Sequence, residues 1–455
     1  MLRKIRVVTL ALMLSAVGQT GAAQSLADTL VAAYRGSNLL EQNRALLRAA
    51  DEDVAQELAA LRPVLNFVTN AQARYNSQQA NSLSLSFELA AEVTLIDFGR
   101  GKLAQEAAKA RVLATRQALV DVEQRVMQNA VSAFMDVRSA TEAVALRQAT
   151  LRVISQELNA ARERFELGEI TRTDVSLAEA RLAAARSMLA AAEGDREFAR
   201  EAYNLATGQY PGQLPPPPAL PHTANSLQVA QDIARRTHPQ VLRAQHEVMA
   251  AELTAERVYA QRRGTVRGSA SVGRQFNSNT PSSTTATAGV NFSVPVYSGG
   301  QLNSLYRQAN AQRDAARSAL HQTVAEVVQN VGVAWANVEV ARARIAASQQ
   351  QVRASQSAFE GTREEARLGA RTTLDVLNAE TDLLDARTTL LQAQASQQIA
   401  TYNLLASMGL LTVDHLGLGI PTYDAEAYFN AVRNAPVTSA QGEALDRVLR
   451  AIGRE

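Results

Sequence analysis

Stretches in which hydrophobic and polar residues alternate lie between much longer stretches with helical periodicity. From Ser82 to Leu95, Leu, Phe, Val and Ala at odd positions alternate mostly with Ser, Glu and Thr at even positions. Residues 285–296 repeat the alternation, with Val290 and Phe292 on the apolar face. A period of two predicts strands with one apolar and one polar face. We expect strands at about 63–76, 82–96, 264–277 and 284–297.

The flanking segments predict long helices at about 26–62, 99–167, 172–208, 227–262, 299–368 and 373–409. No Pro lies between Pro63 and Pro211 or between Pro295 and Pro421. Because an interior Pro costs about 3 kcal/mol, these gaps allow uninterrupted helices. At about 1.5 Å per residue, the long helix of each half extends roughly 100 Å, and its two shorter partners extend roughly 55 Å each. This length balance predicts a cylinder of antiparallel helices.

The order of these elements occurs twice along the chain. A shift of 201 residues places Leu167-Gly168 on Leu368-Gly369 and Asp174-Val175 on Asp375-Val376. The duplication therefore predicts two copies of one structural repeat in the 455 residues, instead of three compact domains. The predicted divisions are repeat 1 at 24–210, a Pro-rich linker at 211–226, repeat 2 at 227–410 and a C-terminal segment at 411–455.

The N-terminus has the pattern of an export signal. Arg3, Lys4 and Arg6 precede an apolar run, and Gly21-Ala22-Ala23 offers small residues for cleavage. We therefore predict a signal peptide at 1–23. The apolar run is too short for a stable membrane-spanning helix.

Composition narrows the function further. Aromatic residues are only 5% of the chain and Ala is the commonest residue, which favours closely packed helices over wide cores. Without the signal, 43 basic residues face 44 acidic ones, so nucleic acid is not an expected partner. The chain has no Cys, and its five His form no i, i+3 or i, i+4 pair, so neither thiolate chemistry nor a metal site is expected.

No catalytic motif accompanies this pattern. Gly101-Lys102 lacks the first Gly and the Ser or Thr of a phosphate loop, and no GxSxG elbow is present. We expect no enzyme activity and no cofactor.

The two-faced strands are long enough to cross a bilayer, for which about 9–11 residues suffice. Arg274 interrupts the apolar face of the third strand, but it lies near the strand end, at the level of lipid headgroups. Four strands cannot close a barrel and open edges are not tolerated in lipid, so a membrane location requires oligomerisation. The alternative is a soluble periplasmic coiled-coil adaptor or structural protein in which the strands form a small sheet.

Short motifs at corresponding places in both halves resemble the TolC family of outer-membrane channel proteins. They are Asp97-Phe98-Gly99-Arg100 and Tyr297-Ser298-Gly299-Gly300 after the second strand of each half, and the Leu-Gly turns that lead into Thr-Asp-Val and Leu-Asp-Val. The tail from Thr422 to Leu449 resembles the C-terminal ends of the type I secretion branch. The expected fold is mainly α with membrane β: a tandem-repeat tunnel of long antiparallel helices plus four strands per chain.

The resemblance implies a homotrimer whose strands close a 12-stranded barrel in the lipid of the cell outer membrane. Its helices would form a tunnel into the periplasm of a Gram-negative bacterium, with the C-terminal segment near the tunnel's equator. The channel would dock to a periplasmic adaptor (membrane fusion) protein and an inner-membrane ABC or RND transporter. It would export proteins by type I secretion, or small toxic compounds.

The candidate site lies at the two helix turns. Gly168 and Gly369 have the spacing of C′ glycines, and Thr171 or Thr173, and Thr372 or Thr373, can cap the returning helices. By resemblance, Arg371 would pair with Thr173 and Asp174 to close the entrance, and Asp375 would form a threefold acidic ring. Asn378 and Ala366 stand where the family often has Asp and Tyr, which implies a less acidic entrance. The alternative is that Asp174 and Asp375 only cap their helices.

Overall fold

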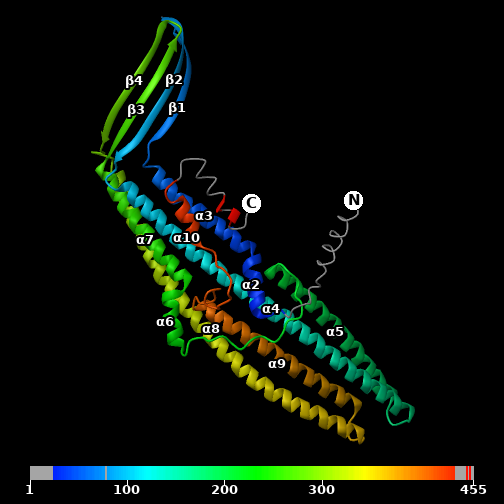
Figure 1. Ribbon diagram of the computed structural model, residues 1–455. Coiled ribbons are helices and arrows are strands. Elements are labelled where there is room, and N and C mark those ends of the chain that lie inside the picture. Colours follow the sequence, from blue (N-terminus) through cyan, green and yellow to red (C-terminus); the bar gives the residue numbers. More distant parts are fainter. Residues whose placement is uncertain (1–23, 77–78, 436–446, 449, 452–455) are drawn as a thin grey trace, which may run out of the picture. The chain divides into compact units, whose positions relative to one another are not determined.

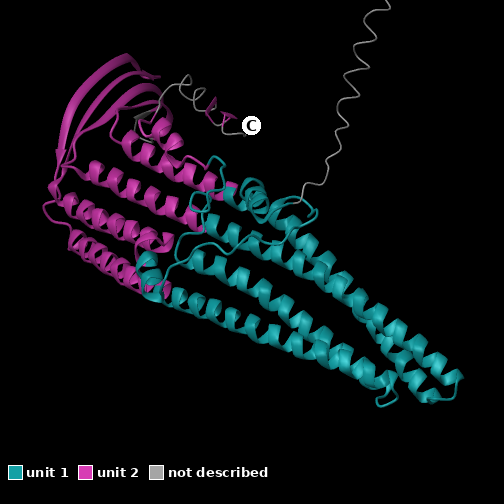
Figure 2. Ribbon diagram, turned by 60° about the horizontal axis from the view of Figure 1, so that its bottom comes forward, with its two compact units in different colours: residues 1–40, 122–234, 328–421 teal, residues 41–121, 235–327, 422–455 magenta. Residues whose placement is uncertain are grey.

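The computed structural model describes residues 24–76, 79–435, 447–448 and 450–451. The predicted signal peptide at 1–23 and most of the tail after Ala435 lie outside the described residues. The chain forms two compact units, and each takes segments from both halves of the sequence (Figure 2). Unit 1 comprises residues 1–40, 122–234 and 328–421, and unit 2 comprises 41–121, 235–327 and 422–455.

The described elements follow the same order in both halves of the chain (Figure 1). In the first half these are α2 (Leu26–Gly36), α3 (Asn38–Ala59), β1 (Val64–Asn76), β2 (Gln79–Ile96), α4 (Arg100–Glu166) and α5 (Arg172–Thr207). In the second half they are α6 (Leu227–Thr237), α7 (Pro239–Ala260), the short η1 (Gln261–Arg263), β3 (Thr265–Asn277), β4 (Thr280–Ser293), α8 (Gln301–Arg367) and α9 (Thr373–Ser407). A further helix, α10 (Ala425–Val432), follows.

Each predicted helix before a strand pair is broken at the equivalent residue, which corrects the expected continuous helices at 26–62 and 227–262. The first break is at Ser37, whose backbone is extended and whose hydroxyl accepts a hydrogen bond from the Leu40 amide at 3.2 Å. The second is at His238, 201 residues later, where Pro239 starts α7. A residue before Pro is driven out of the helical region, and His238 Nδ1 caps α7 by accepting from the Gln240 amide.

The four strands of unit 2 form one antiparallel sheet in the order β1-β2-β3-β4. The register places Leu89 of β2 across from Phe67 and Val272, and Val272 across from Ala286. These residues share the apolar face predicted by the alternation. The opposite face is polar, with Asn70, Ser86, Gln275 and Ser283 paired in one row. β1 and β4 are the two edges of the sheet.

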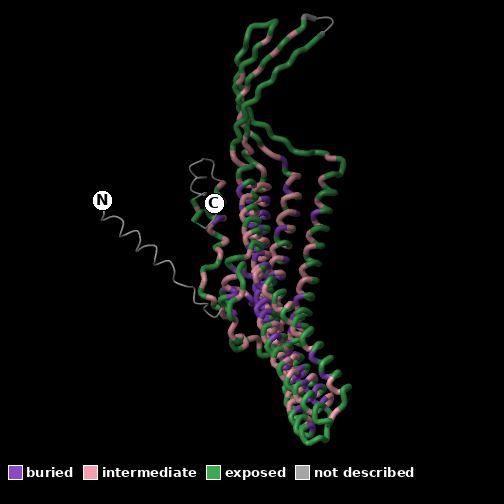
Figure 3. The backbone as a smooth tube through the Cα atoms, turned by 90° about the vertical axis from the view of Figure 1, so that its right-hand side faces the viewer, coloured by how far each residue is buried: buried purple, intermediate pink, exposed green. Residues whose placement is uncertain are grey.

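The sheet is exposed on both faces, whereas buried residues concentrate in the helices (Figure 3). Leu65, Phe67 and Val290 are 65%, 69% and 70% exposed. A contiguous apolar face of this kind marks contact with lipid or another protein, because water covers it poorly. Among the described residues, no helix is both long enough and apolar enough to cross a membrane.

Strand limits differ from those expected at two places. β2 begins at Gln79, three residues early, and β4 runs over Thr280–Ser293 instead of 284–297. Pro295 lacks the amide hydrogen that would continue the ladder, so Val294 and Val296 fall outside β4. After β2, the Asp97 carboxylate accepts from the amides of Gly99 and Gly101 at 3.0 and 2.5 Å, and so caps α4.

The helix α10, which the sequence analysis did not predict, belongs to unit 2 and contacts α3 and α4. The Tyr428 hydroxyl donates to Glu52 of α3 at 2.8 Å, and Arg116 of α4 donates to Glu426 at 3.2 Å. Asp51 of α3 is fully buried, and neither of its carboxylate oxygens accepts a hydrogen bond from a residue that the structure describes. Burial raises the pKa of Asp51 to about 6, although the nearby Arg116 opposes the rise.

The pH dependence of stability should report on Asp51. Its pKa is higher in the folded chain than the ordinary value of 3.8, so its contribution is greatest below pH 4 and is lost as pH rises through 6. At 1.36 kcal/mol per pKa unit, roughly 3 kcal/mol of the free energy of unfolding should disappear between pH 4 and pH 8. Thermal unfolding of Asp51→Asn should lack this slope. The exposed Asp53 of the same helix supplies the control, and a slope that survives Asp51→Asn but not Asp53→Asn would refute the assignment.

Candidate functional site

The two Leu-Gly turns have the same backbone geometry. Gly168 and Gly369 adopt positive φ angles of 78° and 80°, which a Cβ would strain. The amide of the residue after each glycine donates to a carbonyl five positions back, from Glu169 to Arg164 and from Ala370 to Glu365, both at 2.9 Å. This is the Schellman ending expected of a C′ glycine. It reverses the chain within a few residues, so that α5 and α9 return along α4 and α8.

Each returning helix begins with a capping box. Thr171 caps α5 and Thr372 caps α9, which decides between the two candidates that the sequence left at each turn. The carboxylates of Asp174 and Asp375 accept from the Thr171 and Thr372 amides at 2.9 and 3.0 Å. These backbone hydrogen bonds, and then those from the threonine hydroxyls, lower the pKa of both carboxyls below their ordinary value. Both residues are therefore helix caps within the chain.

Arg371 lies in the second turn and bonds locally. Its Nε donates to Glu365 at 2.9 Å, and this hydrogen bond raises the pKa of Arg371 above its ordinary value. Within the described part of the chain it is not bonded to Thr173 or Asp174. Thr173 is exposed in the first turn of α5. The expected pairing of Arg371 with Thr173 and Asp174 thus stays a prediction.

Asn378 links the two repeats, a role that the sequence did not suggest. Its side-chain oxygen accepts from Arg181 of α5 at 3.0 Å. Ala366, the other position where the chain departs from the family pattern, is buried against Phe359 of α8 and against Val376 and Leu383 of α9. A Tyr there would have to displace this packing.

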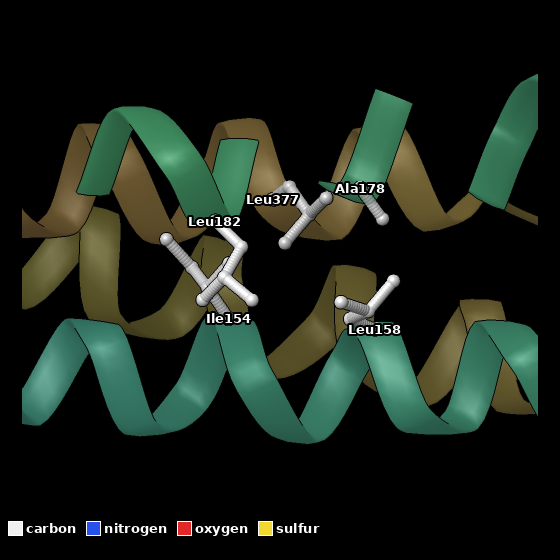
Figure 4. Close-up of a cluster of buried hydrophobic side chains, with 5 residues drawn as sticks. All are labelled: Ile154, Leu158, Ala178, Leu182 and Leu377. Carbon is white, nitrogen blue, oxygen red and sulfur yellow. The ribbon is translucent and has the colours of Figure 1, made fainter. Parts of the chain in front are cut away.

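Two apolar clusters hold the turn region together in unit 1. One joins three helices, as Figure 4 shows: Ile154 and Leu158 of α4, Ala178 and Leu182 of α5, and Leu377 of α9. The other packs α8 against α9. Because α9 takes part in both, it is the common neighbour through which the two turns are held relative to one another.

A buried polar contact lies on α9 one turn beyond Val376. Glu380 is 4% exposed and accepts from the Thr150 hydroxyl of α4 at 2.8 Å. Burial raises the pKa of Glu380, against the effects of Thr150, Arg387 and Arg363. This residue was not predicted from the sequence. The only sequence signal was an acidic residue at a position that the helical period places on the buried face of α9.

The chain is similar in sequence to a known protein family and to two characterised outer-membrane proteins. The sequence model of the outer membrane efflux protein family matches residues 30–209 and 231–410. A relative from Brucella suis biovar 1 (strain 1330), the outer membrane efflux protein BepC, is 32% identical over 426 residues, which are 92% of each chain. The outer membrane protein TolC of Escherichia coli (strain K12) is 24% identical over 437 residues, 91% of this chain and 88% of its own.

Solved structures match the fold. A CusC crystal structure aligns with a TM-score of 0.75 at 20% identity, covering 85% of this chain and 92% of its own. The MtrE channel of Neisseria gonorrhoeae, solved in an open state, aligns with a TM-score of 0.73 at 21% identity, covering 85% and 89%.

The two-faced sheet, the long helices and their tight turns together define a channel protein of the outer membrane, not an enzyme. The chain belongs to the outer membrane efflux protein family, that is, the TolC family. The expected location in the outer membrane is thereby confirmed. The alternative of a soluble periplasmic adaptor is set aside.

Adjacent threonines at the second turn allow a matched test of the cap. The Thr372 hydroxyl caps α9, whereas the buried Thr373 hydroxyl has no hydrogen-bond partner among the described residues. Thr372→Val should destabilise the first turn of α9 by about 1 kcal/mol, because Val cannot cap. Thr373→Val should be neutral or stabilising, because it removes an unsatisfied buried oxygen.

Hydrogen exchange of the α9 amides in the detergent-purified protein measures both effects. Faster exchange at Asp375 and Val376 is expected in Thr372→Val alone. Equal exchange in the two variants would show that the capping box does not hold the turn.

Proposed function

We propose that three copies of the chain close a 12-stranded barrel in the outer membrane, continued by a helical tunnel in the periplasm. The single observation that carries this is the four-stranded sheet with an exposed apolar face and two edges, β1 and β4. An open edge in lipid leaves backbone groups unbonded, so the edges must pair with further copies. TolC-family channels are trimeric and work with inner-membrane transporters and adaptors, which supports this number.

The periplasmic entrance is formed by the two Leu-Gly turns and the residues after them. Along the chain, the 67 residues of α4 or α8 separate each turn from the preceding strand, and on this ground the turns are assigned to the entrance. In the closed trimer, Arg371 leaves Glu365 to pair with Thr173 and Asp174. Asp375 of each copy faces the axis, where a ring of carboxylates attracts cations and repels anions.

The ion pair at the surface of the turn region resists movement only weakly. The ion pair between Arg162 of α4 and Glu179 of α5 is about half exposed on both sides, and exposed pairs contribute at most about 1 kcal/mol. The Thr150–Glu380 bond is buried and more costly to break. Opening therefore displaces the turns while this deeper link anchors α9 to α4.

The energy for export comes from partner proteins, a periplasmic adaptor and an inner-membrane ABC or RND transporter. The proposed cargo is small toxic compounds, because the relative that is 32% identical over 92% of the chain is named an efflux protein. Protein export by type I secretion is a second candidate. It rests on the tail from Thr422 to Leu449, which resembles that branch of the family.

Conductance of the purified protein in a planar bilayer tests the channel and its gate. The double variant Arg371→Ser, Asp174→Ala should conduct several-fold more than the wild type, because it removes the closing pair. Asp375→Asn keeps an oxygen for the Thr372 amide but removes the charge, so it should lower cation selectivity, read as the reversal potential.

Two controls separate gating from general loosening. Arg162→Ser, Glu179→Ala removes an equally exposed ion pair of the same region, and Thr171→Val removes the α5 cap while keeping Asp174. Both should leave conductance unchanged. Unchanged conductance in the Arg371 and Asp174 double variant, or an equal rise in a control, would refute the gate, and absence of any channel would refute the proposed function.

Deletion of the gene distinguishes the two cargo classes. Loss of an efflux duct should raise susceptibility to lipophilic toxic compounds at least fourfold, with full recovery when the wild-type gene is restored. The proteins of the culture medium should be unchanged. A missing secreted protein with unchanged susceptibility would instead favour type I secretion.

A further inference from the structure

Arg274 lies where the sheet would meet the outer leaflet of the membrane. The helices α3, α4, α7 and α8 all join the strands at one end of the sheet, and short connections join β1 to β2 and β3 to β4 at the other. Arg274 is three residues from the end of β3 at Asn277, on the side of these connections. With the helices in the periplasm, this end faces the exterior. The placement rests on the proposed barrel.

Arg274 is on the apolar face of the sheet. The register sets it across from Phe87 of β2 and Thr284 of β4, and Val272 and Phe276 flank it on the same face of β3. Within the described strands no other charged residue shares this face, where the paired residues are otherwise Leu, Val, Ile, Phe, Ala, Gly and Thr. A lone arginine in such a place is costly unless a polar group in the lipid receives it.

One aromatic ring contacts the guanidinium directly. The Arg274 Cζ lies 5.1 Å from the centre of the Phe276 ring. Phe276 in turn makes an edge contact with Phe87 at 6.3 Å, and Phe87 stacks on Phe67 at 6.4 Å. The Phe276 ring holds the charge by a cation–π contact, and Arg274 stays exposed.

The carboxylates of the strands do not reach this side. Glu88 and Glu92 lie on the polar face, where Arg267 donates to Glu92 at 3.3 Å. Arg274 forms no ion pair among the described residues. Because β3 is an inner strand, both of its neighbours belong to the same chain, and the surroundings of Arg274 are complete in one protomer.

We propose that Arg274 and Thr284 bind the phosphate of an anionic lipid of the outer leaflet, lipid A in an outer membrane. A guanidinium offers paired N–H donors to phosphate oxygens, and the Thr284 hydroxyl adds a donor from the next strand. The acyl chains lie along Val272, Leu89 and Ala286, deeper in the same face. At about 3.4 Å per residue, the arginine is roughly 10 Å along the strand from the end of β3. With strands tilted by about 45°, this is a depth of roughly 7 Å, which the long side chain spans towards the headgroups.

Native mass spectrometry of the detergent-purified trimer tests this site, with lipid A and dephosphorylated lipid A as probes. Arg274→Gln should weaken lipid A binding about tenfold, equivalent to about 1.4 kcal/mol, and Arg274→Lys should weaken it less. Arg74→Gln is the matched control, because Arg74 is near the same end of the sheet but on the polar face, across from Ser82. It should bind lipid A as the wild type does.

Three other results of the binding experiment would contradict the proposal. Equal binding of the dephosphorylated lipid, equal loss in Arg274→Gln and Arg74→Gln, or displacement of lipid A by millimolar inorganic phosphate would overturn the lipid site. Cell fractionation distinguishes failure of the lipid site from failure of the proposed function. An Arg274→Gln trimer that reaches the outer membrane and binds lipid A normally overturns the lipid site alone, whereas a wild-type chain missing from outer membranes overturns both.

Discussion

Backbone hydrogen bonding in a medium without water is the constraint on which the remaining structure depends. Four antiparallel strands satisfy their inner backbone groups but leave two edges, and a bilayer offers those edges no partner. The same strands bury little within the chain, since both faces of the sheet are exposed. The sheet alone is therefore not expected to be stable in water. Its alternating pattern, its register and its edges are all consistent with completion by lipid and by further copies.

The helices, in contrast to the sheet, pack against one another within the chain. Their buried residues are largely small, and Ala lines many contacts of α4, α7 and α9. Small side chains allow close helix approach without a wide core. Polar contacts between helices, such as the Thr150–Glu380 bond, need defined geometry and each contributes little net energy, so they fix the relative placement of helices more than they add to stability. Duplication gives each half the same breaks, caps and turns, at Ser37 and His238 and again at Gly168 and Gly369.

Much of this could be predicted from sequence because its determinants are local. Alternation located the four strands, Pro-free stretches located α4 and α8, and Leu-Gly located both turns. The breaks at Ser37 and His238 were missed, although Pro239 was a local signal that long helical periodicity obscured. Glu380 and α10 could not be found, because their roles depend on contacts with α4 and α3 from distant parts of the chain. The partner of Arg371 could not be predicted from the sequence either, because Glu365, six residues away, competes with any residue of the first repeat for the Arg371 guanidinium.

The capping boxes at the turns place an evolutionary restriction on this end of the molecule. The carboxylates of Asp174 and Asp375 already accept hydrogen bonds from the N-cap amides of Thr171 and Thr372, so each stabilises the start of its own helix. A substitution that altered ion preference at either position would also alter how well a helix begins, and in a trimer it would do so three times at once. In the proposed entrance, selection on permeation and selection on folding would therefore act on the same two side chains. Adaptation to a new cargo is consequently easier at neighbours such as Asn378, whose loss leaves both helix starts intact.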